Sequence, residues 1–327
     1  ARIDLKNRSD AASLNFTALV RSAEKAAKLK QLGVKTVVGS HTDVALVEKL
    51  AYEADVVLSI ADCDYLPAAE AFLKGLEYRF KDTGNVPILI HTVNHCAGVL
   101  IDNAAGAFAG ETIYDDANPD QIETLAPSQP HREVDLAIIK ADKEGYVKTY
   151  IILPSTIYGL ASNKLVDLGI QNPHSIQIPA LIDASLSRGQ GGMVGQGKNM
   201  WPNVHIDDVA DLYIVLYDSI KNNPATGHGR EGFYFGENGE HTLYQIGKAI
   251  SEALVEIGRG NSPEPTTFSK EEVQKYFGSN YLGTNSRCRA NRSRAIGWKP
   301  TKTTADMLGS IKLEVADSLH RKPVPLR

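Results

Sequence analysis

The sequence has few cysteines, and they are not grouped as a disulfide framework or a zinc site would require. Cys63, Cys96 and Cys288 are widely separated, and none belongs to a C-x-x-C pair. His91 and His95 have the i, i+4 spacing of two metal ligands on one helix. They follow a strand-like run, however, so we expect no metal site.

Long apolar runs and an excess of positive charge are missing as well. The longest apolar runs, such as residues 86–90 and 151–154, fall far short of the roughly 20 residues that span a bilayer. The first residues contain no apolar stretch typical of a secretory signal. With 35 Lys and Arg against 39 Asp and Glu, the chain lacks the basic patch that nucleic acid requires. We therefore expect a cytoplasmic protein that binds neither membrane nor nucleic acid.

What the sequence does contain is an alternation of apolar strand patterns and amphipathic helix patterns. Such alternation predicts a parallel sheet covered by helices on both faces, a doubly wound α/β fold. The predicted strands are residues 15–21, 35–38, 55–60, 87–92 and 148–153, and the helices between them are 22–32, 44–54 and 66–80.

The sequence pattern changes after residue 154, where loops rich in Gly, Asn and Pro separate the predicted helices. Single cores stop growing at roughly 250–300 residues, so a chain of 327 residues suggests a core with a lobe attached. We expect a Rossmann-like core over 1–160, and the remaining sheet elements with a substrate lobe over 161–327. The helices predicted for the second half are 176–188, 206–222, 242–258 and 303–319.

Several segments occur in an order that resembles NAD(P)-dependent epimerase/dehydratase proteins, the extended short-chain dehydrogenases/reductases, and in particular atypical fungal members. Each segment alone is a weak signal, but their ordered spacing from about residue 15 to 313 is specific. The segments are TALVR (17–21), GVKTVVGS (33–40), ADVVL (54–58), ILIHT (88–92), LPSTIYG (153–159), WPNVHIDDVADLY (201–213) and RAIGWKP (294–300).

The resemblance implies a first strand and a glycine-rich phosphate turn before Asn15. Only fourteen residues precede Asn15, and the first glycine is Gly33. A phosphate turn needs glycine so that backbone N–H groups can approach the pyrophosphate. We expect that the sequence begins inside the first βαβ unit; the alternative is a rebuilt phosphate site.

The resemblance also implies which residues meet the cofactor. Arg21 ends the second strand of the family pattern, where a cation suits the 2′-phosphate of NADP and a carboxylate would suit NAD. NADP is therefore expected, with NAD as the alternative. The resemblance places Ile60, Ala61 and Asp62 beside the cofactor and Pro154, Ser155 and Thr156 along the nicotinamide pocket.

The catalytic Tyr-x-x-x-Lys pair of the family is only half present. Lys140 matches the lysine, but Leu136 stands where the tyrosine belongs. Lys140 can still bind the nicotinamide ribose, and Thr92 matches a residue that bonds the substrate oxygen. We expect these two at the catalytic site. The Tyr-x-x-x-Lys pairs Tyr217/Lys221 and Tyr244/Lys248 lie far downstream and are interpreted as coincidence.

Other acid, base and substrate groups are weaker candidates. Asp135, His131 and Tyr158 are possible replacements for the missing phenol. Tyr158, Arg188 and His205 are expected to meet the substrate, although His205 also suits a structural role. These features favour an NAD(P)-dependent oxidoreductase or epimerase-like enzyme acting on a small carbonyl or hydroxyl compound, as a monomer or homodimer. The alternative is a non-catalytic NAD(P)-binding regulator resembling NmrA-like proteins.

Overall fold

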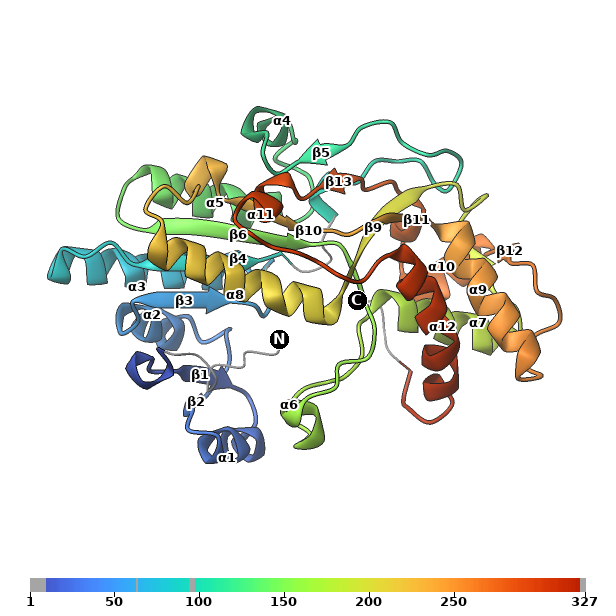
Figure 1. The fold of residues 1–327 in the computed structure, drawn as a ribbon, viewed down its shortest axis with the longest axis horizontal. Coiled ribbons are helices and arrows are strands. Elements are labelled where there is room, and N and C mark those ends of the chain that lie inside the picture. Colours follow the sequence, from blue (N-terminus) through green and yellow to red (C-terminus); the bar gives the residue numbers. More distant parts are fainter. Residues whose placement is uncertain (1–9, 63, 94–97, 324–327) are drawn as a thin grey trace.

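The computed structural model describes residues 10–62, 64–93 and 98–323, and its centre is a parallel sheet (Figure 1). Four strands pair in parallel in the order β10, β6, β4, β3. Runs of branched apolar residues form these strands because both faces of the sheet are covered. The strands are β3 (Val56–Ser59), β4 (Ile88–Thr92), β6 (Lys148–Pro154) and β10 (Phe233–Gly236).

A second, smaller sheet is formed by β1 (Thr17–Val20) and β2 (Lys35–Val38), which also run parallel. Helix α1 (Ala23–Gln31) connects these two strands, and α2 (Val44–Tyr52) leads from β2 to β3. In Figure 1 this sheet lies below β3. Within the described residues, β1 pairs only with β2, and β3 pairs only with β4.

Helices cover the main sheet on both faces, as β4 demonstrates. The ring of His91 lies 6.5 Å from that of Phe72 on α3 (Leu66–Thr83). Its neighbour Thr92 points to the other face and meets Tyr213 on α8 (Ile206–Asn222). Adjacent strand residues point to opposite faces, so α3 and α8 flank the sheet. The expected doubly wound α/β fold is confirmed.

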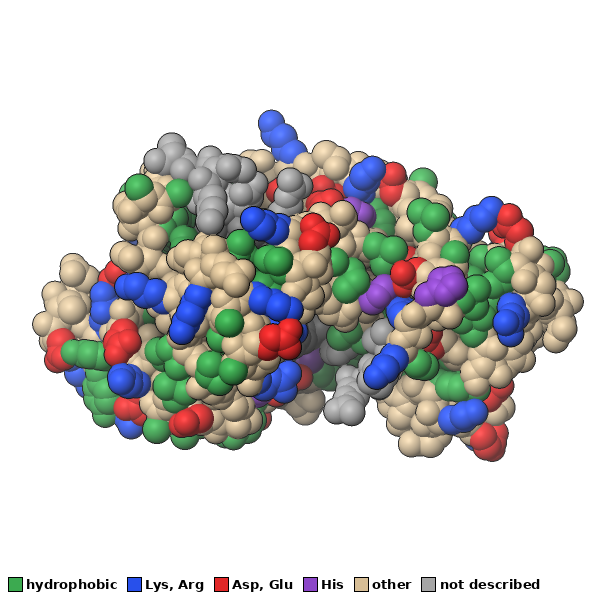
Figure 2. All heavy atoms as spheres, turned by 90° about the horizontal axis from the view of Figure 1, so that it is seen from below, with side chains coloured by type: hydrophobic (Ala, Val, Ile, Leu, Met, Phe, Trp, Pro, Cys, Tyr) green, Lys and Arg blue, Asp and Glu red, His purple; other side chains and the backbone are tan. Residues whose placement is uncertain are grey.

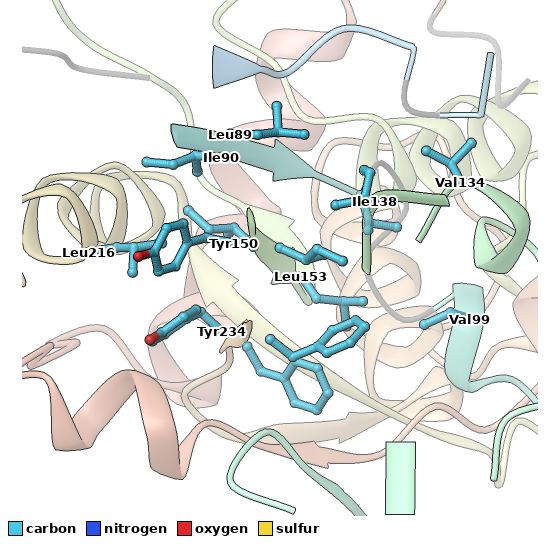
Figure 3. Close-up of a cluster of buried hydrophobic side chains, with 14 of the residues drawn as sticks. Leu89, Ile90, Val99, Val134, Ile138, Tyr150, Leu153, Leu216 and Tyr234 are labelled. Atoms are coloured by element: carbon cyan, nitrogen blue, oxygen red, sulfur yellow. The ribbon is translucent and has the colours of Figure 1, made fainter. Parts of the chain in front are cut away.

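The hydrophobic core fills the space between this sheet and its helices (Figure 3). Helix α5 (Arg132–Lys143) contributes Val134 and Ile138, and α8 contributes Leu216. Tyr150 and Tyr234 stand side by side on the paired strands β6 and β10, with ring centroids 6.3 Å apart.

The second half of the chain adds a helical lobe with a core of its own. In Figure 1 this lobe lies to the right of the sheet. Its helices are α7 (Gln177–Arg188), α9 (Leu243–Glu256), α10 (Lys270–Phe277) and α12 (Thr304–Ser318). Its strands are β7 (Thr156–Tyr158), β8 (Gly192–Met193), β9 (Met200–His205), β11 (Glu240–Thr242) and β12 (Thr266–Thr267).

The remaining elements are short and connect the two halves. Strand β13 pairs in parallel with β5, which joins the C-terminal part to the loop after β4. These elements are η2 (Ala11–Ser13), η3 (Gly98–Leu100), β5 (Tyr114–Asp115), α4 (Pro119–Glu123), α6 (Lys164–Asp167), η4 (Gly229–Glu231), η5 (Tyr281–Gly283), β13 (Cys288–Arg289) and α11 (Asn291–Ala295).

The surface carries charges of both signs. In Figure 2, Lys and Arg side chains lie among Asp and Glu side chains on the face seen from below. In the part of the chain that the structure describes, no helix is apolar over a length that would cross a bilayer.

Candidate functional site

The carboxyl ends of the parallel strands meet at one edge, which is where open α/β sheets bind ligands. His41 follows β2 and Asp62 follows β3, and their side chains form an ion pair of 3.0 Å between Nε2 and Oδ2. This contact joins the carboxyl ends of the two sheets. We call the residues that follow β1, β2, β3, β4 and β6 at these ends the carboxyl edge.

The predicted cofactor residues after β3 lie in an exposed loop at the carboxyl edge. Ile60, Ala61 and Asp62 are accessible to solvent. Asp62 has a φ of +47°, in the left-handed region that few residues other than glycine, asparagine and aspartate adopt. The backbone therefore turns sharply here, and the His41 contact holds the turn.

Arg21 follows β1 directly and is exposed. Its guanidinium makes no hydrogen bond or ion pair with any residue that the structure describes. An uncommitted guanidinium at a strand end suits an anion with several oxygens, because its planar fork can donate two parallel bonds to a phosphate. The side chain present thus fits the adenosine end of NADP.

The residues predicted along the nicotinamide pocket are buried and engaged in the fold. Pro154 ends β6, and the amide and hydroxyl of Ser155 both donate to the carbonyl of Gly236, at 2.8 and 2.7 Å. The Thr156 hydroxyl donates to the side chain of Gln177 on α7, at 2.9 Å. These three residues tie β6 to β10 and to the helical lobe.

The two predicted catalytic residues lie on different sides of the sheet. Lys140 is exposed on α5, 3.8 Å from Glu144, and Leu136 one turn earlier is also exposed. Thr92 is buried, and its hydroxyl lies 2.5 Å from the hydroxyl of Tyr213 on α8. Lys140 and Leu136 share one face of α5, as their i, i+4 spacing predicts.

The structure brings two of the predicted substrate residues together. The rings of Tyr158 and His205 meet edge to face with centroids 5.2 Å apart. Both line a groove of about 580 Å³ beside α12. The Tyr158 hydroxyl donates to the carbonyl of Thr303, and burial raises its pKa far above the ordinary value. His205 caps α8 by accepting the amide of Asp207.

Arg188, the third predicted substrate residue, is the last residue of α7. Its guanidinium donates to the Thr266 hydroxyl at 2.8 Å and stacks on the ring of Phe268 at 4.8 Å. Glu272 lies 3.3 Å from its Nε. These contacts join α7 to β12 and α10.

The downstream Tyr-x-x-x-Lys pairs belong to the surface. Tyr244 and Lys248 both bond the carboxylate of Glu264. Lys221 bonds Asp10, at 2.7 Å. Tyr244, Lys248 and Glu264 thus form one exposed hydrogen-bonded group.

Ionisable groups gather where α5 begins beside the carboxyl edge. His131 is the N-cap of α5, and its Nδ1 bonds the carboxylate of Asp64 in the loop after β3. Asp135 is fully buried one turn into the helix, and burial raises its pKa to about 7. His91 on β4 is also buried, which lowers its pKa to about 4. The charges of Asp64 and His131 act on both buried groups.

Asp135 of this cluster and Arg132, which follows His131 on α5, have buried polar atoms without a partner among the described residues. Both carboxylate oxygens of Asp135 and the Nε and Nη1 of Arg132 make no hydrogen bond there. Unpaired buried polar groups cost free energy, so they concentrate at functional sites. Sequence reasoning named His131 and Asp135 but missed Asp64. The signal available was its place in the loop between β3 and α3, at the carboxyl edge. His95, paired with His91 in the metal argument, lies outside the described residues.

Two curated proteins are similar in sequence over most of this chain, while no family model matches it. An oxidase, ucsJ, from an Acremonium species is 28% identical over 305 residues, covering 86% of this chain and 84% of that protein. An uncharacterized protein from Schizosaccharomyces pombe is 24% identical over 303 residues, covering 88% and 86%.

Solved structures give the fold. The UDP-glucose 4-epimerase of Thermotoga maritima aligns with a TM-score of 0.60 at 13% identity, covering 95% of this chain and 93% of that one. The dTDP-glucose 4,6-dehydratase of Bacillus anthracis, in complex with NAD, aligns at 0.58 and 15%, covering 94% and 89%. A yeast methylglyoxal/isovaleraldehyde reductase complexed with NADPH aligns at 0.54 and 11%, covering 93% and 91%. The chain therefore has the Rossmann-like fold of NAD(P)-dependent epimerase/dehydratase proteins, as the sequence resemblance implied.

Proposed function

We propose that this protein is an NADP-dependent oxidoreductase or epimerase-like enzyme that acts on a small carbonyl or hydroxyl compound. The observation that carries the proposal is the exposed guanidinium of Arg21 at the carboxyl edge, where a parallel sheet binds its ligand. The similar structures in complex with NAD or NADPH support a dinucleotide in this place.

Arg21 determines the expected cofactor preference. A charge-assisted contact with the 2′-phosphate contributes roughly 1.5–3 kcal/mol, so NADPH is expected to bind about 10- to 100-fold more tightly than NADH. Calorimetric titration of both cofactors measures the ratio. The Arg21→Ala variant should bring the two affinities together, while Arg259→Ala, an exposed arginine after α9, should leave the ratio unchanged. Equal affinities in the unchanged protein contradict the preference.

Turnover is measured separately from binding. Methylglyoxal and isovaleraldehyde serve as carbonyl probes, because the yeast reductase is named for them, and UDP-glucose serves as the epimerase probe. NADPH oxidation followed at 340 nm reports reduction, and product analysis reports epimerisation. We expect reduction of a carbonyl probe.

A second function is favoured by one observation on α5. Leu136 is exposed where the family carries a phenol, which fits a regulator that binds NAD(P) without catalysis. Such a protein would bind NADPH and consume none of the probes. Binding with turnover supports the enzyme, and binding without turnover supports the regulator.

A further inference from the structure

His131 combines a left-handed backbone conformation with a side-chain bond to Asp64. Its φ is +69°, in the left-handed region that residues other than glycine seldom adopt. Its imidazole is only 7% exposed, whereas the Asp64 carboxylate is 54% exposed. The pair therefore connects solvent with the interior at the start of α5. Strained backbone of this kind is concentrated at active sites and ligand-binding sites.

The other nitrogen of His131 faces a phenol from the second half of the chain. A methyl group added to Gly98 would lie 2.5 Å from His131 Nε2 and 3.3 Å from the hydroxyl of Tyr281. The two atoms are thus no farther apart than the sum of these distances, which is the span of two hydrogen bonds.

Tyr281 is fixed in this place by its surroundings. It begins η5, and its ring packs edge-on against Trp201 with centroids 5.1 Å apart. Its carbonyl accepts bonds from the amide and hydroxyl of Thr284. Gly98 follows β4 and Asp64 follows β3, so the phenol meets the His131–Asp64 pair at the carboxyl edge.

The geometry points to a proton relay formed by Tyr281, His131 and Asp64, which takes the place of the phenol that α5 lacks at position 136. This inference rests on the proposed function, because the relay needs a redox partner. A bound nicotinamide would supply a hydride to the substrate's carbonyl carbon.

The relay supplies the proton that completes the reduction. The O–H bond of Tyr281 breaks, and its proton goes to the carbonyl oxygen, which becomes a hydroxyl. His131 gives its Nε2 proton to the phenolate and becomes neutral. Asp64 keeps the Nδ1 proton in place by accepting its hydrogen bond, as in other carboxylate–imidazole pairs. A proton from water then returns to Nε2. One hydride and one proton are consumed for each carbonyl reduced.

Other charged groups surround the imidazole of His131. Asp64 faces it from the loop after β3, His91 from β4, and Arg132 and Asp135 from α5 itself. Tyr281 faces it from η5. Removing the Asp64 carboxylate removes the acceptor of the Nδ1 proton, so the ring loses the contact that fixes its tautomer.

The first experiment needs no substrate. Nitrogen-15 NMR of the histidine rings reports protonation and tautomer for each imidazole in the folded protein. We expect the neutral His131 ring to carry its proton on Nδ1, to lose this tautomer preference in Asp64→Asn, and to change its Nε2 shift in Tyr281→Phe. His228, which bonds Asp142 on the far end of α5, is the internal control. A His131 signal that ignores both substitutions overturns the relay.

The second experiment separates the relay from the proposed function. Tyr281→Phe should lower kcat for the carbonyl probe by about 100- to 10,000-fold with the Kd for NADPH within twofold. Asp64→Asn should also lower kcat, because the imidazole loses the carboxylate that orients it. Tyr244→Phe, which alters a surface Tyr-x-x-x-Lys pair, should leave both unchanged. An active Tyr281→Phe enzyme contradicts the relay alone, whereas failure of the unchanged protein to bind NADPH overturns the proposed function and the relay with it.

Discussion

The β1–α1–β2 unit and strand β6 are both parallel-sheet structure, yet they are buried to very different degrees. Every residue of β6 after Lys148 is buried, whereas no residue of β1 or β2 is. In α1 only Ala26 is buried. Regions with few buried apolar contacts open at lower free energy than the core. The comparison teaches that hydrogen-bond pattern alone does not set local stability, and that the unit carrying Arg21 is held less firmly than the start of α5.

Removing a large side chain from each region should give the largest difference. Leu153 on β6 is 1% exposed and Val38 on β2 is 53% exposed. Leu153→Ala should lower the free energy of unfolding by about 2–5 kcal/mol, because it leaves a cavity. Val38→Ala should change it by less than about 0.5 kcal/mol. Urea unfolding followed by circular dichroism measures both, and equal losses would break the comparison.

The two regions should also differ in how their stability depends on pH, because only the start of α5 contains a buried carboxyl group, Asp135. Burial raises the pKa of Asp135 to about 7, so between about pH 4 and 7 the folded protein binds a proton that the unfolded chain releases. The stability contributed by Asp135 is therefore present below about pH 4 and is lost as the pH rises through 7.

Asp135→Asn removes this dependence. Its stability relative to the unchanged protein should rise by roughly 1–4 kcal/mol between pH 5 and 8, since one pKa unit corresponds to about 1.4 kcal/mol. Urea midpoints across this range give the difference. In the β1–α1–β2 unit, Glu24 is exposed and pairs with Lys28 on α1. Glu24→Gln should show no such slope, and a flat difference for Asp135→Asn would contradict the buried charge.

Removing a helix cap should give the smallest change in stability. The change should be global for a cap in the core and local for a cap in the β1–α1–β2 unit. Thr242 caps α9 in a capping box, and Ser22 caps α1 by accepting the amide of Lys25. Thr242→Ala should lower the free energy of global unfolding by about 1 kcal/mol. Ser22→Ala should instead speed amide hydrogen exchange in α1 and leave the urea midpoint in place. A shifted midpoint in Ser22→Ala would mean that the unit unfolds together with the core.

The longer strands and helices could be predicted from the sequence because their signals are local. Branched apolar runs gave β2 at Lys35–Val38, and the amphipathic pattern gave α8 at Ile206–Asn222. The short strands β8 and β12 were missed, since two-residue pairs carry no periodicity. Their existence depends on contacts between residues far apart in the chain.

The candidate site was predicted only in part, for the same reason. His131 was named from its place beside the family's catalytic segment. Tyr281 lies 150 positions further along the sequence, and nothing near it signals chemistry. Only the folded chain places its hydroxyl near His131, and it does so because Gly98 leaves room for both side chains.

At His131 the left-handed backbone favours glycine for folding stability, whereas the proposed relay requires an imidazole. Glycine adopts that conformation without strain, so a library selected only for heat resistance should be enriched in His131→Gly. A library selected for turnover should reject the same change. Sequencing both populations gives the frequency of glycine at position 131 after each selection. A large difference between the two frequencies would mean that function, rather than folding, maintains the imidazole.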